Sequence, residues 1–278
     1  MARRTSRLTA VAVAAAALML TALLCLAGCG GDGAASGGKT LRVGVRSDIV
    51  GFSYLNEETG NYYGLEVDIA EEMAARMGYG NVEFVTVTPD SRKQMLLDGQ
   101  VDCLVACYSI SDSRQENFDF SPTYYADAAV VMVADSSLVQ DLDDMKGLTF
   151  GTMSGSNTSP LLVLKLMDEG FTSGDALDKQ EVDGAVVTTF DNFTLQQISS
   201  YQELSDALEE GTVDAACMDG SIAQTYMQDD RHLLDFTIAE QEYGVATQKD
   251  SALSAQVAQT IQGMLDDGTI AGLIDKWD

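Results

Sequence analysis

An arginine stands at an unusual position in the segment CLVACYSISDSRQENFDFSPTYY, residues 103–125. Ser111 has the place of a helix N-cap, and the residue three positions later is normally Glu or Gln, whose side chain reaches back to the cap. Here that residue is Arg114, a cation in the first turn, where the helix dipole disfavours positive charge. A guanidinium placed there is suited to a bidentate bond with a carboxylate from outside the chain. The alternative is a surface arginine that folds back on Glu116 or Asp119.

The first 28 residues have the pattern of a secretory signal peptide, with three arginines followed by an apolar run. The run ends in Leu-Ala-Gly before Cys29, which resembles the lipobox of bacterial lipoproteins and implies cleavage and lipidation at that cysteine. An ordinary signal peptide or an uncleaved anchor is the alternative. Residues 29–40 are rich in glycine and predict a flexible tether. We therefore expect a body outside the cytoplasmic membrane, held to it by a lipid anchor.

The composition is strongly acidic, with 43 Asp and Glu against 16 Lys and Arg and a formal charge of −27. Such a balance argues against nucleic-acid binding. After the tether, no stretch approaches the roughly 20 apolar residues that span a bilayer. The remaining body of about 240 residues is long enough for one large domain or two smaller lobes.

Three cysteines follow the tether, namely Cys103, Cys107 and Cys217. Cys103 and Cys107 fall in one expected strand, which would place them roughly 13 Å apart. A disulfide needs Cα atoms within about 7 Å, so these two cannot pair with each other, and buried free thiols are expected. With one histidine in the chain and no zinc-type spacing, we predict neither a metal nor a cofactor.

Strand-like runs alternate with helical patterns from residue 41 onward. LRVGV, VEFVTV and VDCLVACYS predict strands, and VDIAEEMAARMGYG and SRKQMLLDG predict helices. The same order restarts after residue 134, and the later LEEGTVDAACMD is similar to the earlier LLDGQVDCLVAC. The alternation indicates an α/β protein with two similar lobes, each a mostly parallel sheet flanked by helices.

Five segments resemble, in the correct order, the bacterial family 3 solute-binding proteins, which deliver polar amino acids to ABC importers. They are GLEVDIAEEMAARM, SISDSRQENFDFSPTYY, GTMSGSNTS, VDAACMDG and the carboxy-terminal run from YGVATQKD to DKW. The resemblance implies a two-lobed periplasmic-binding-protein-like fold of type II, with two crossing strands joining the lobes. Lobe 1 would comprise residues 41–126 plus 244–278, and lobe 2 residues 127–243, with the ligand between them.

The resemblance also implies roles for individual residues. A free amino acid carries a carboxylate and an ammonium, and each needs a partner when buried. Arg114 would bind the carboxylate, and Ser109 and Ser111 match positions that donate further hydrogen bonds to it. Asp219, at the end of VDAACMD, stands where the family places the partner of the α-ammonium.

Four more residues belong to the expected ligand-binding set. Asn157 and Thr158 lie at the expected start of a helix in lobe 2, where they would cap the helix or let its free N–H groups face the ligand. Phe52 would form an apolar wall, with plain core packing as the alternative. Cys107 is also expected to belong to the ligand-binding set.

Arg92 bears on specificity. It aligns with an arginine of the glutamate/aspartate-type branch, which meets the carboxylate of the ligand's side chain. Binders of cationic amino acids usually stack the ligand between aromatic rings, but the corresponding positions here are Ile49 and Pro89. The resemblance therefore favours glutamate or aspartate, and neutral polar amino acids and cystine remain alternatives.

The expected function is the substrate-binding component of an ABC importer, a monomer that captures a polar amino acid between closing lobes and delivers it to the permease and its ATPase. Two rivals share the fold: a dehydratase-like enzyme acting on a small carboxylate, and a ligand sensor. The enzyme would need a positioned acid or base. The only histidine is His232, and neither G-x-S-x-G nor H-E-x-x-H occurs, so we expect no enzyme.

Overall fold

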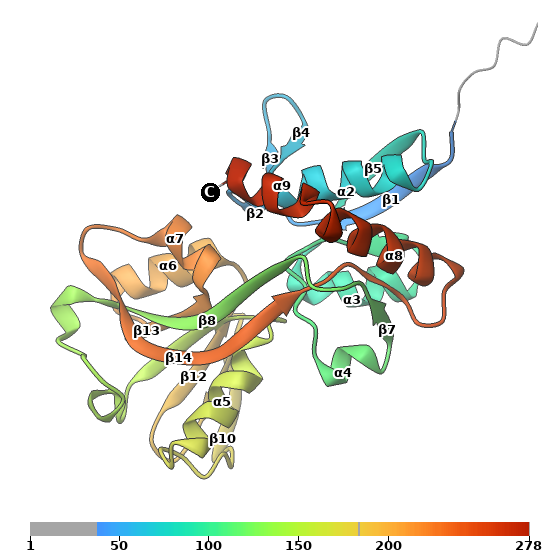
Figure 1. Ribbon diagram of the computed structural model, residues 1–278. Helices are drawn as coiled ribbons and strands as arrows, with labels where there is room; N and C mark the ends of the chain where they lie inside the picture. The colour runs from blue at the N-terminus through green and yellow to red at the C-terminus, as the bar shows by residue number, and fades with distance from the viewer. Residues whose placement is uncertain (1–37, 183, 278) are drawn as a thin grey trace, which may run out of the picture. The chain divides into compact units, whose positions relative to one another are not determined.

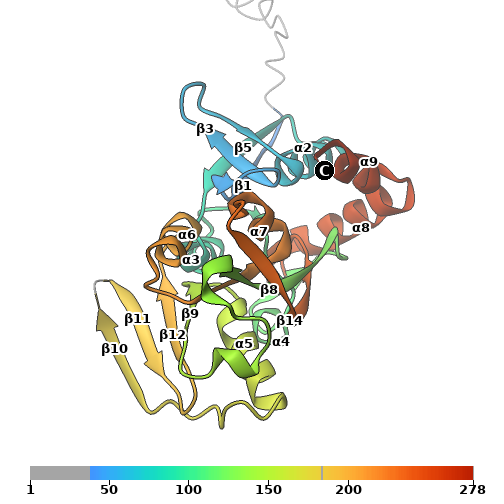
Figure 2. The same ribbon diagram turned by 90° about the vertical axis from the view of Figure 1, so that its left-hand side faces the viewer.

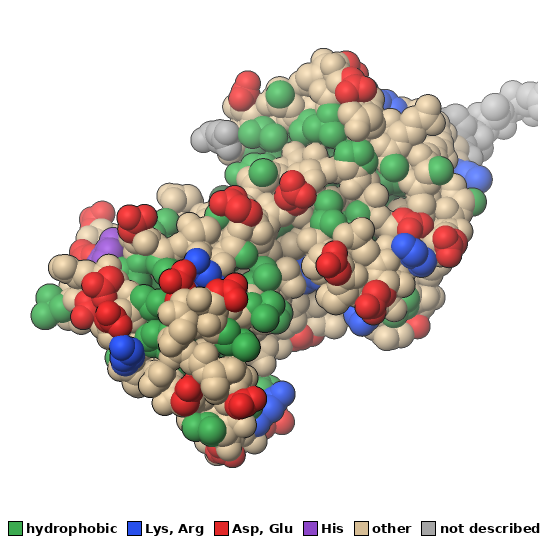
Figure 3. Space-filling view, turned by 60° about the horizontal axis from the view of Figure 1, so that its bottom comes forward, with side chains coloured by type: hydrophobic (Ala, Val, Ile, Leu, Met, Phe, Trp, Pro, Cys, Tyr) green, Lys and Arg blue, Asp and Glu red, His purple; other side chains and the backbone are tan. Residues whose placement is uncertain are grey.

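The computed structural model describes residues 38–182 and 184–277 (Figure 1). The predicted signal peptide, the lipidated Cys29 and most of the tether lie outside the described residues. Residues 38–278 form one compact unit. Within the described part of the chain, the helices are too short or too polar to cross a membrane. Acidic side chains are scattered over the face shown in Figure 3, in keeping with the charge of −27.

The first sheet has five strands in the order β5-β1-β6-β15-β7. Its strands are β1 (Thr40–Val45), β5 (Asn81–Thr86), β6 (Cys103–Leu104), β7 (Phe118–Phe120) and β15 (Ala246–Gln248). The associated helices are α2 (Leu65–Arg76), α3 (Pro89–Leu97), α4 (Asp112–Gln115), α8 (Ala252–Asp266) and α9 (Thr269–Trp277). A separate antiparallel sheet contains β2 (Asp48–Ile49), β3 (Ser53–Asn56) and β4 (Asn61–Tyr63).

The second sheet has seven strands in the order β10-β11-β12-β9-β13-β8-β14, and Figure 2 shows its β10 end. Its strands are β8 (Tyr125–Ala134), β9 (Thr149–Met153), β10 (Asp178–Val182), β11 (Ala185–Thr189), β12 (Thr194–Ile198), β13 (Ala215–Asp219) and β14 (Arg231–Tyr243). The helices here are α5 (Thr158–Asp168), α6 (Tyr201–Glu210) and α7 (Gly220–Tyr226), with 3-10 turns at Asp135–Ser137 and Asp143–Met145.

Strands β8 and β14 link the two sheets. They pair antiparallel from Tyr125 with Tyr243 to Ala134 with Arg231, and Figure 1 shows them side by side. At the Tyr243 end, β14 also bridges Ser109, and Tyr124 N–H donates to the Tyr243 carbonyl at 2.9 Å. The sheets are mixed rather than mostly parallel. Parallel pairing is confined to β5-β1-β6 and β12-β9-β13, because the strands outside these groups return in antiparallel sense.

Most predicted elements are present, and one strand is shorter than expected. In α2 the four-residue spacing of Ile69 and Met73 forms the buried face. The strand predicted to run through Cys107 ends at Leu104 instead. The backbone leaves the sheet there, and Cys107 has a φ of 43°, in the left-handed region. Cys103, Cys107 and Cys217 are nevertheless free and buried, as expected.

Gly64, which precedes α2, is fixed by a close approach of two backbones. It has a φ of 137°, and a Cβ there would overlap the carbonyl of Phe52, which accepts from Glu66 N–H at 2.9 Å. We expect Gly64→Ala to lower the free energy of unfolding by about 2 kcal/mol or more, measured by urea denaturation. Gly78→Ala is the control, because Gly78 also has positive φ but open space around it, and should lose only about 1 kcal/mol.

Candidate functional site

Arg114 is the third residue of the short helix α4, whose N-cap residue is Ser111. Its guanidinium carbon is 4.2 Å from the ring centroid of Tyr108, and Nη1 donates to the Ser109 carbonyl at 2.8 Å. Among the described residues it has no ion-pair partner, and Asp119 pairs with Lys249 instead. Burial, and then the nearby Arg92, lower the pKa of Arg114 to about 10. The guanidinium is thus held in place without an ion pair from the described chain, although the charge of Asp219 acts on it from a greater distance.

Arg92 projects from α3 towards the same tyrosine and is only 3% exposed. Its guanidinium carbon is 4.5 Å from the Tyr108 centroid, and Nη1 donates to the Ala106 carbonyl at 2.7 Å. The structure assigns it no carboxylate partner within the described ranges, and its buried Nε has no hydrogen bond there. Burial, followed by the charge of Arg46, lowers the pKa of Arg92.

Arg46 is a second buried guanidinium near the partly buried Arg114, and it was not selected from the sequence. It follows β1 directly, is 2% exposed, and forms an ion pair with Asp48 at 2.6 Å. It also reaches Met153 Sδ at 3.8 Å and lies 5.6 Å from the Tyr201 ring centroid. Burial alone would lower the pKa of Arg46, but Asp48, with contributions from Tyr201 and Cys107, more than offsets burial, and the pKa is raised. Its place at the carboxyl end of a parallel strand, where α/β proteins bind ligands, is the signal that could have identified it.

Asp219 is the last residue of β13 and the N-cap residue of α7. It is 5% exposed; Oδ2 accepts from the Tyr243 hydroxyl at 2.5 Å, and Oδ1 accepts from Gln241 Nε2 and from the Thr158 hydroxyl at 3.4 Å. Burial, with a contribution from Asp127, raises its pKa to about 6. In the part of the chain that the structure describes, no cation forms an ion pair with it. Asp219 is therefore a buried acid that a ligand cation could neutralise.

Gln241 of β14 connects the two predicted halves of the site, and it too was missed from the sequence. Its Oε1 accepts from the Ser109 hydroxyl at 2.5 Å, while its Nε2 donates to Asp219. Ser109 and Gln241 are 3% and 4% exposed. Because Ser109 also binds Arg114 through its carbonyl, a continuous chain of hydrogen bonds runs from Arg114 to Asp219.

The other predicted residues lie at different depths around this chain. Thr158, the first residue of α5, is 1% exposed and reaches Asp219. Asn157 occupies the N-cap position, but its side chain makes no capping hydrogen bond. Ser111 is partly exposed, with its hydroxyl 3.4 Å from that of Ser113 rather than in the chain of hydrogen bonds. Ser156 precedes Asn157 in the chain. Its hydroxyl is buried and has no hydrogen-bond partner among the described residues.

Phe52 and Cys107 are buried beside the site. Phe52 packs edge-on against Tyr125 at 4.9 Å and Tyr243 at 6.1 Å between centroids and belongs to a hydrophobic core cluster. Cys107 contributes its backbone, whose N–H donates to Glu66 Oε1 at 2.5 Å. Glu66 is fully buried, and burial raises its pKa. Its Oε2 is another buried atom with no partner within the described ranges.

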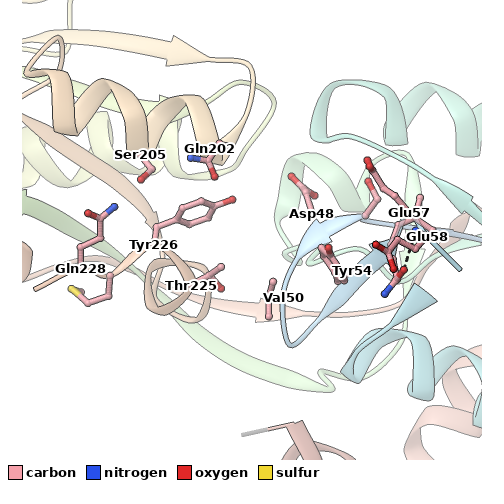
Figure 4. Close-up of a pocket in the computed structure, with 14 residues that line it drawn as sticks. Asp48, Val50, Tyr54, Glu57, Glu58, Gln202, Ser205, Thr225, Tyr226 and Gln228 are labelled. Carbon is pink, nitrogen blue, oxygen red and sulfur yellow. Dashed lines mark hydrogen bonds between the residues drawn. The ribbon is translucent and has the colours of Figure 1, made fainter. Parts of the chain in front are cut away.

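Two cavities adjoin these residues and differ in charge. A cavity of about 330 Å³ is lined by Arg114, Tyr108 and Gly155 and also by the charged residues Asp90 and Lys93. A larger one of about 860 Å³ lies beyond Asp48 (Figure 4). Every charged residue that lines the larger cavity is acidic, so it offers nothing to a carboxylate. We therefore place the candidate site at the buried arginines and Asp219 rather than in the larger cavity.

Known proteins share the sequence pattern and the fold. A family model, bacterial extracellular solute-binding proteins of family 3, matches residues 41–278. The arginine-binding extracellular protein ArtP of Bacillus subtilis (strain 168) is 26% identical over 266 residues, covering 94% of both chains. The glutamate-binding protein GluB of Corynebacterium glutamicum is 26% identical over 297 residues, covering 99% of this chain and 92% of GluB.

A solved structure supports the fold. The arginine-, lysine-, histidine-binding protein ArtJ of Geobacillus stearothermophilus superposes with a TM-score of 0.70 at 21% identity, covering 86% of this chain and 95% of ArtJ. The predicted α/β fold of the type II periplasmic-binding-protein kind is confirmed. The chain belongs to the bacterial extracellular solute-binding proteins of family 3.

Proposed function

We propose that this protein is the lipid-anchored substrate-binding component of an ABC importer for an acidic amino acid, glutamate or aspartate. Lipidation at Cys29 would hold it outside the cytoplasmic membrane, and the permease with its ATPase would be its partner. The two sheets would belong to two lobes, residues 41–126 with 244–278 and residues 127–243, that close on the ligand. The relatives support an amino-acid ligand, since ArtP and GluB are named for arginine and glutamate.

One observation carries the choice of an acidic ligand. Arg92 and Arg114 are guanidinium groups without ion pairs in the described chain, and Asp219 is a buried carboxylate that also lacks one. Arg46 is already paired with Asp48. A charge in such surroundings costs free energy unless it is paired, so a ligand that pairs with Arg92, Arg114 and Asp219 together brings two carboxylates and one ammonium. Glutamate and aspartate each carry two carboxylates and one ammonium. Arginine carries one carboxylate, and its guanidinium is a second cation beside the ammonium.

The proposed capture of the ligand between the lobes depends on where its three charged partners lie. Arg114 and Arg92 belong to the helices beside the first sheet, and Asp219 ends a strand of the second. A ligand that binds both sets of groups stabilises the arrangement in which the sheets approach and leaves a separated arrangement without those contacts. The structure already has direct contacts of this kind, such as the Ser154 hydroxyl with Asp90 Oδ1 at 3.1 Å.

The test is a calorimetric titration of the purified protein, unfolded and refolded to remove any bound ligand, with glutamate, aspartate, glutamine, cystine and arginine. Tight binding of glutamate or aspartate alone is expected. Preference for glutamine, cystine or arginine would refute the acidic ligand. Analysis of each ligand after incubation addresses the enzyme alternative, because a dehydratase-like enzyme would convert it and a binding protein returns it unchanged.

Arg92 should determine the choice between acidic and neutral ligands. Arg92→Ala removes the partner proposed for the side-chain carboxylate, and we expect glutamate affinity to fall by roughly 100-fold, because an unpaired buried charge costs 2–5 kcal/mol. Glutamine, which has no second charge, should lose less than roughly tenfold. Calorimetry with both ligands measures the ratio. Arg42→Ala is the control, since Arg42 also donates to backbone carbonyls beside the first sheet, at Gly99 and Gln100, and its loss should leave both affinities unchanged.

Equal losses of glutamate and glutamine affinity in Arg92→Ala would show that Arg92 does not meet the ligand's side chain. That outcome would leave the family assignment intact, because the assignment does not depend on Arg92.

A further inference from the structure

Gln241 has a donor and an acceptor arranged like those of an amino-acid ligand. Its carbonyl oxygen accepts from the Ser109 hydroxyl, and its amide nitrogen donates to Asp219. In an amino acid bound at the proposed site, the carboxylate would likewise accept a hydrogen bond from Ser109, and the ammonium would donate one to Asp219. The side chain of Gln241 therefore makes, within the protein, a neutral version of the contacts proposed for the ligand.

The surroundings of Asp219 show what this contact means for a ligand. A carboxylate has about four acceptor positions. Three donors of the protein already use three of these positions: Gln241 and Thr158 at Oδ1 and Tyr243 at Oδ2. An ammonium has three N–H donors and gains most from Asp219 when Oδ1 is free to accept from it. The amide of Gln241 occupies that oxygen.

Asp219 does not need Gln241 to stay in position. The Tyr243 hydroxyl binds Oδ2 at 2.5 Å, and Tyr243 itself is fully buried in the strand that crosses between the sheets. Thr158 adds a contact from α5. Removing the amide of Gln241 would thus free Oδ1 while the carboxylate remains oriented.

We propose that Gln241 sets the affinity of the site by competing with the ligand's ammonium for Asp219. This inference rests on the proposed function, because it needs a ligand that carries an ammonium to Asp219. It assigns to Gln241 a role opposite to that of Arg114: Arg114 strengthens binding, and Gln241 limits it. In the wild type, the ligand's ammonium must break the hydrogen bond from the Gln241 amide to the buried Asp219 carboxylate before it can take its place.

The test compares wild type with Gln241→Met, which keeps most of the side-chain volume but has no amide. We expect Gln241→Met to bind glutamate roughly tenfold more tightly by calorimetry, the gain that corresponds to one hydrogen bond to a charged group. Gln248→Met is the matched control: Gln248 donates to the carbonyls of Leu96 and Leu97, outside the chain of hydrogen bonds at the site, so its glutamate affinity should equal that of wild type.

Glutarate is the second probe, since it has both carboxylates of glutamate and no ammonium. Competition for Asp219 predicts that Gln241→Met gains affinity for glutamate and not for glutarate. Thermal melting verifies that each variant is folded, and Gln241→Ala replaces Gln241→Met if methionine does not fit.

The outcomes separate the two proposals. Unchanged or weaker glutamate binding in the folded Gln241 variants, or an equal gain for glutarate, would overturn the role of Gln241 and leave the proposed function standing. If wild type binds neither glutamate nor any other amino acid of the panel, the proposed function fails and the role of Gln241 fails with it.

Discussion

Arg114→Ala is expected to weaken amino-acid binding by at least roughly 100-fold, whichever amino acid the protein prefers, because truncating one partner of a buried charge pair costs about 2–5 kcal/mol. Arg114 has no ion pair within the described residues, so its loss breaks no salt bridge of the chain itself. What it removes is the proposed partner of the ligand's α-carboxylate, a group that all amino acids share. Calorimetric titration with glutamate and glutamine should show similar losses for both.

Two further variants sharpen this test. Arg114→Lys keeps the charge but replaces the planar fork by a point charge, so its affinity should fall between those of wild type and Arg114→Ala. Arg76→Ala removes an arginine that pairs with Glu72 and Asp267 away from the site, and it should bind as wild type does. If the folded Arg114→Ala protein retains wild-type affinity, Arg114 is not the carboxylate partner.

Most elements of the fold could be predicted because they follow from local patterns. The apolar spacing in α2 and the alternation in β1 indicate buried faces without any knowledge of the partner element. The mixed sense of the sheets could not be predicted in this way. It depends in part on β15 and β14, which return from distant parts of the sequence, and in part on β10, β11 and β12, which pair antiparallel with their neighbours along the chain. The end of β6 was also missed, because Cys107 adopts a left-handed backbone that its residue type does not indicate.

The candidate site was predicted in part, and what was missed has a physical pattern. Arg114, Ser109 and Asp219 lie within segments whose residues match a family motif. Gln241 is 132 residues from Ser109, and its role arises only when β14 brings its side chain between Ser109 and Asp219. Such long-range hydrogen bonds depend on strand register and side-chain direction, which a single sequence does not determine.

The carboxylate of Asp219 favours ligand binding but lowers the stability of the folded protein without ligand. Its pKa is raised to about 6, which means that the folded protein disfavours the charged form. The same charge is what a ligand ammonium requires. Functional groups that destabilise the folded state without ligand are a common source of trade-off between stability and activity.

Asp219→Asn should therefore lose binding and gain stability. The ion pair with the ammonium disappears, so glutamate affinity should fall by roughly 100-fold or more. The amide removes a buried charge whose pKa is raised from 3.8 to about 6, and this difference corresponds to a gain on the order of 3 kcal/mol in unfolding free energy at pH 7. The Asn oxygen can take the place of Oδ1 and accept from Gln241 and Thr158, while its NH₂ group donates to the Tyr243 hydroxyl oxygen. Calorimetry measures the first effect, and urea denaturation the second.

The pH dependence of the stability gain identifies its cause. Below pH 3.8 Asp219 is protonated in both the folded and the unfolded wild type, so the variant should have no advantage there. The advantage should grow as pH rises from about 4, where the unfolded state releases the proton first, and level off above about 6. Asp267→Asn is a control of opposite sign, because hydrogen bonds from Thr269 and Arg76 lower the pKa of Asp267 to about 2, and its loss should slightly destabilise the protein at neutral pH. An Asp219→Asn protein that is less stable than wild type at pH 7, or equally more stable at pH 4, would show that the buried charge is not the cause.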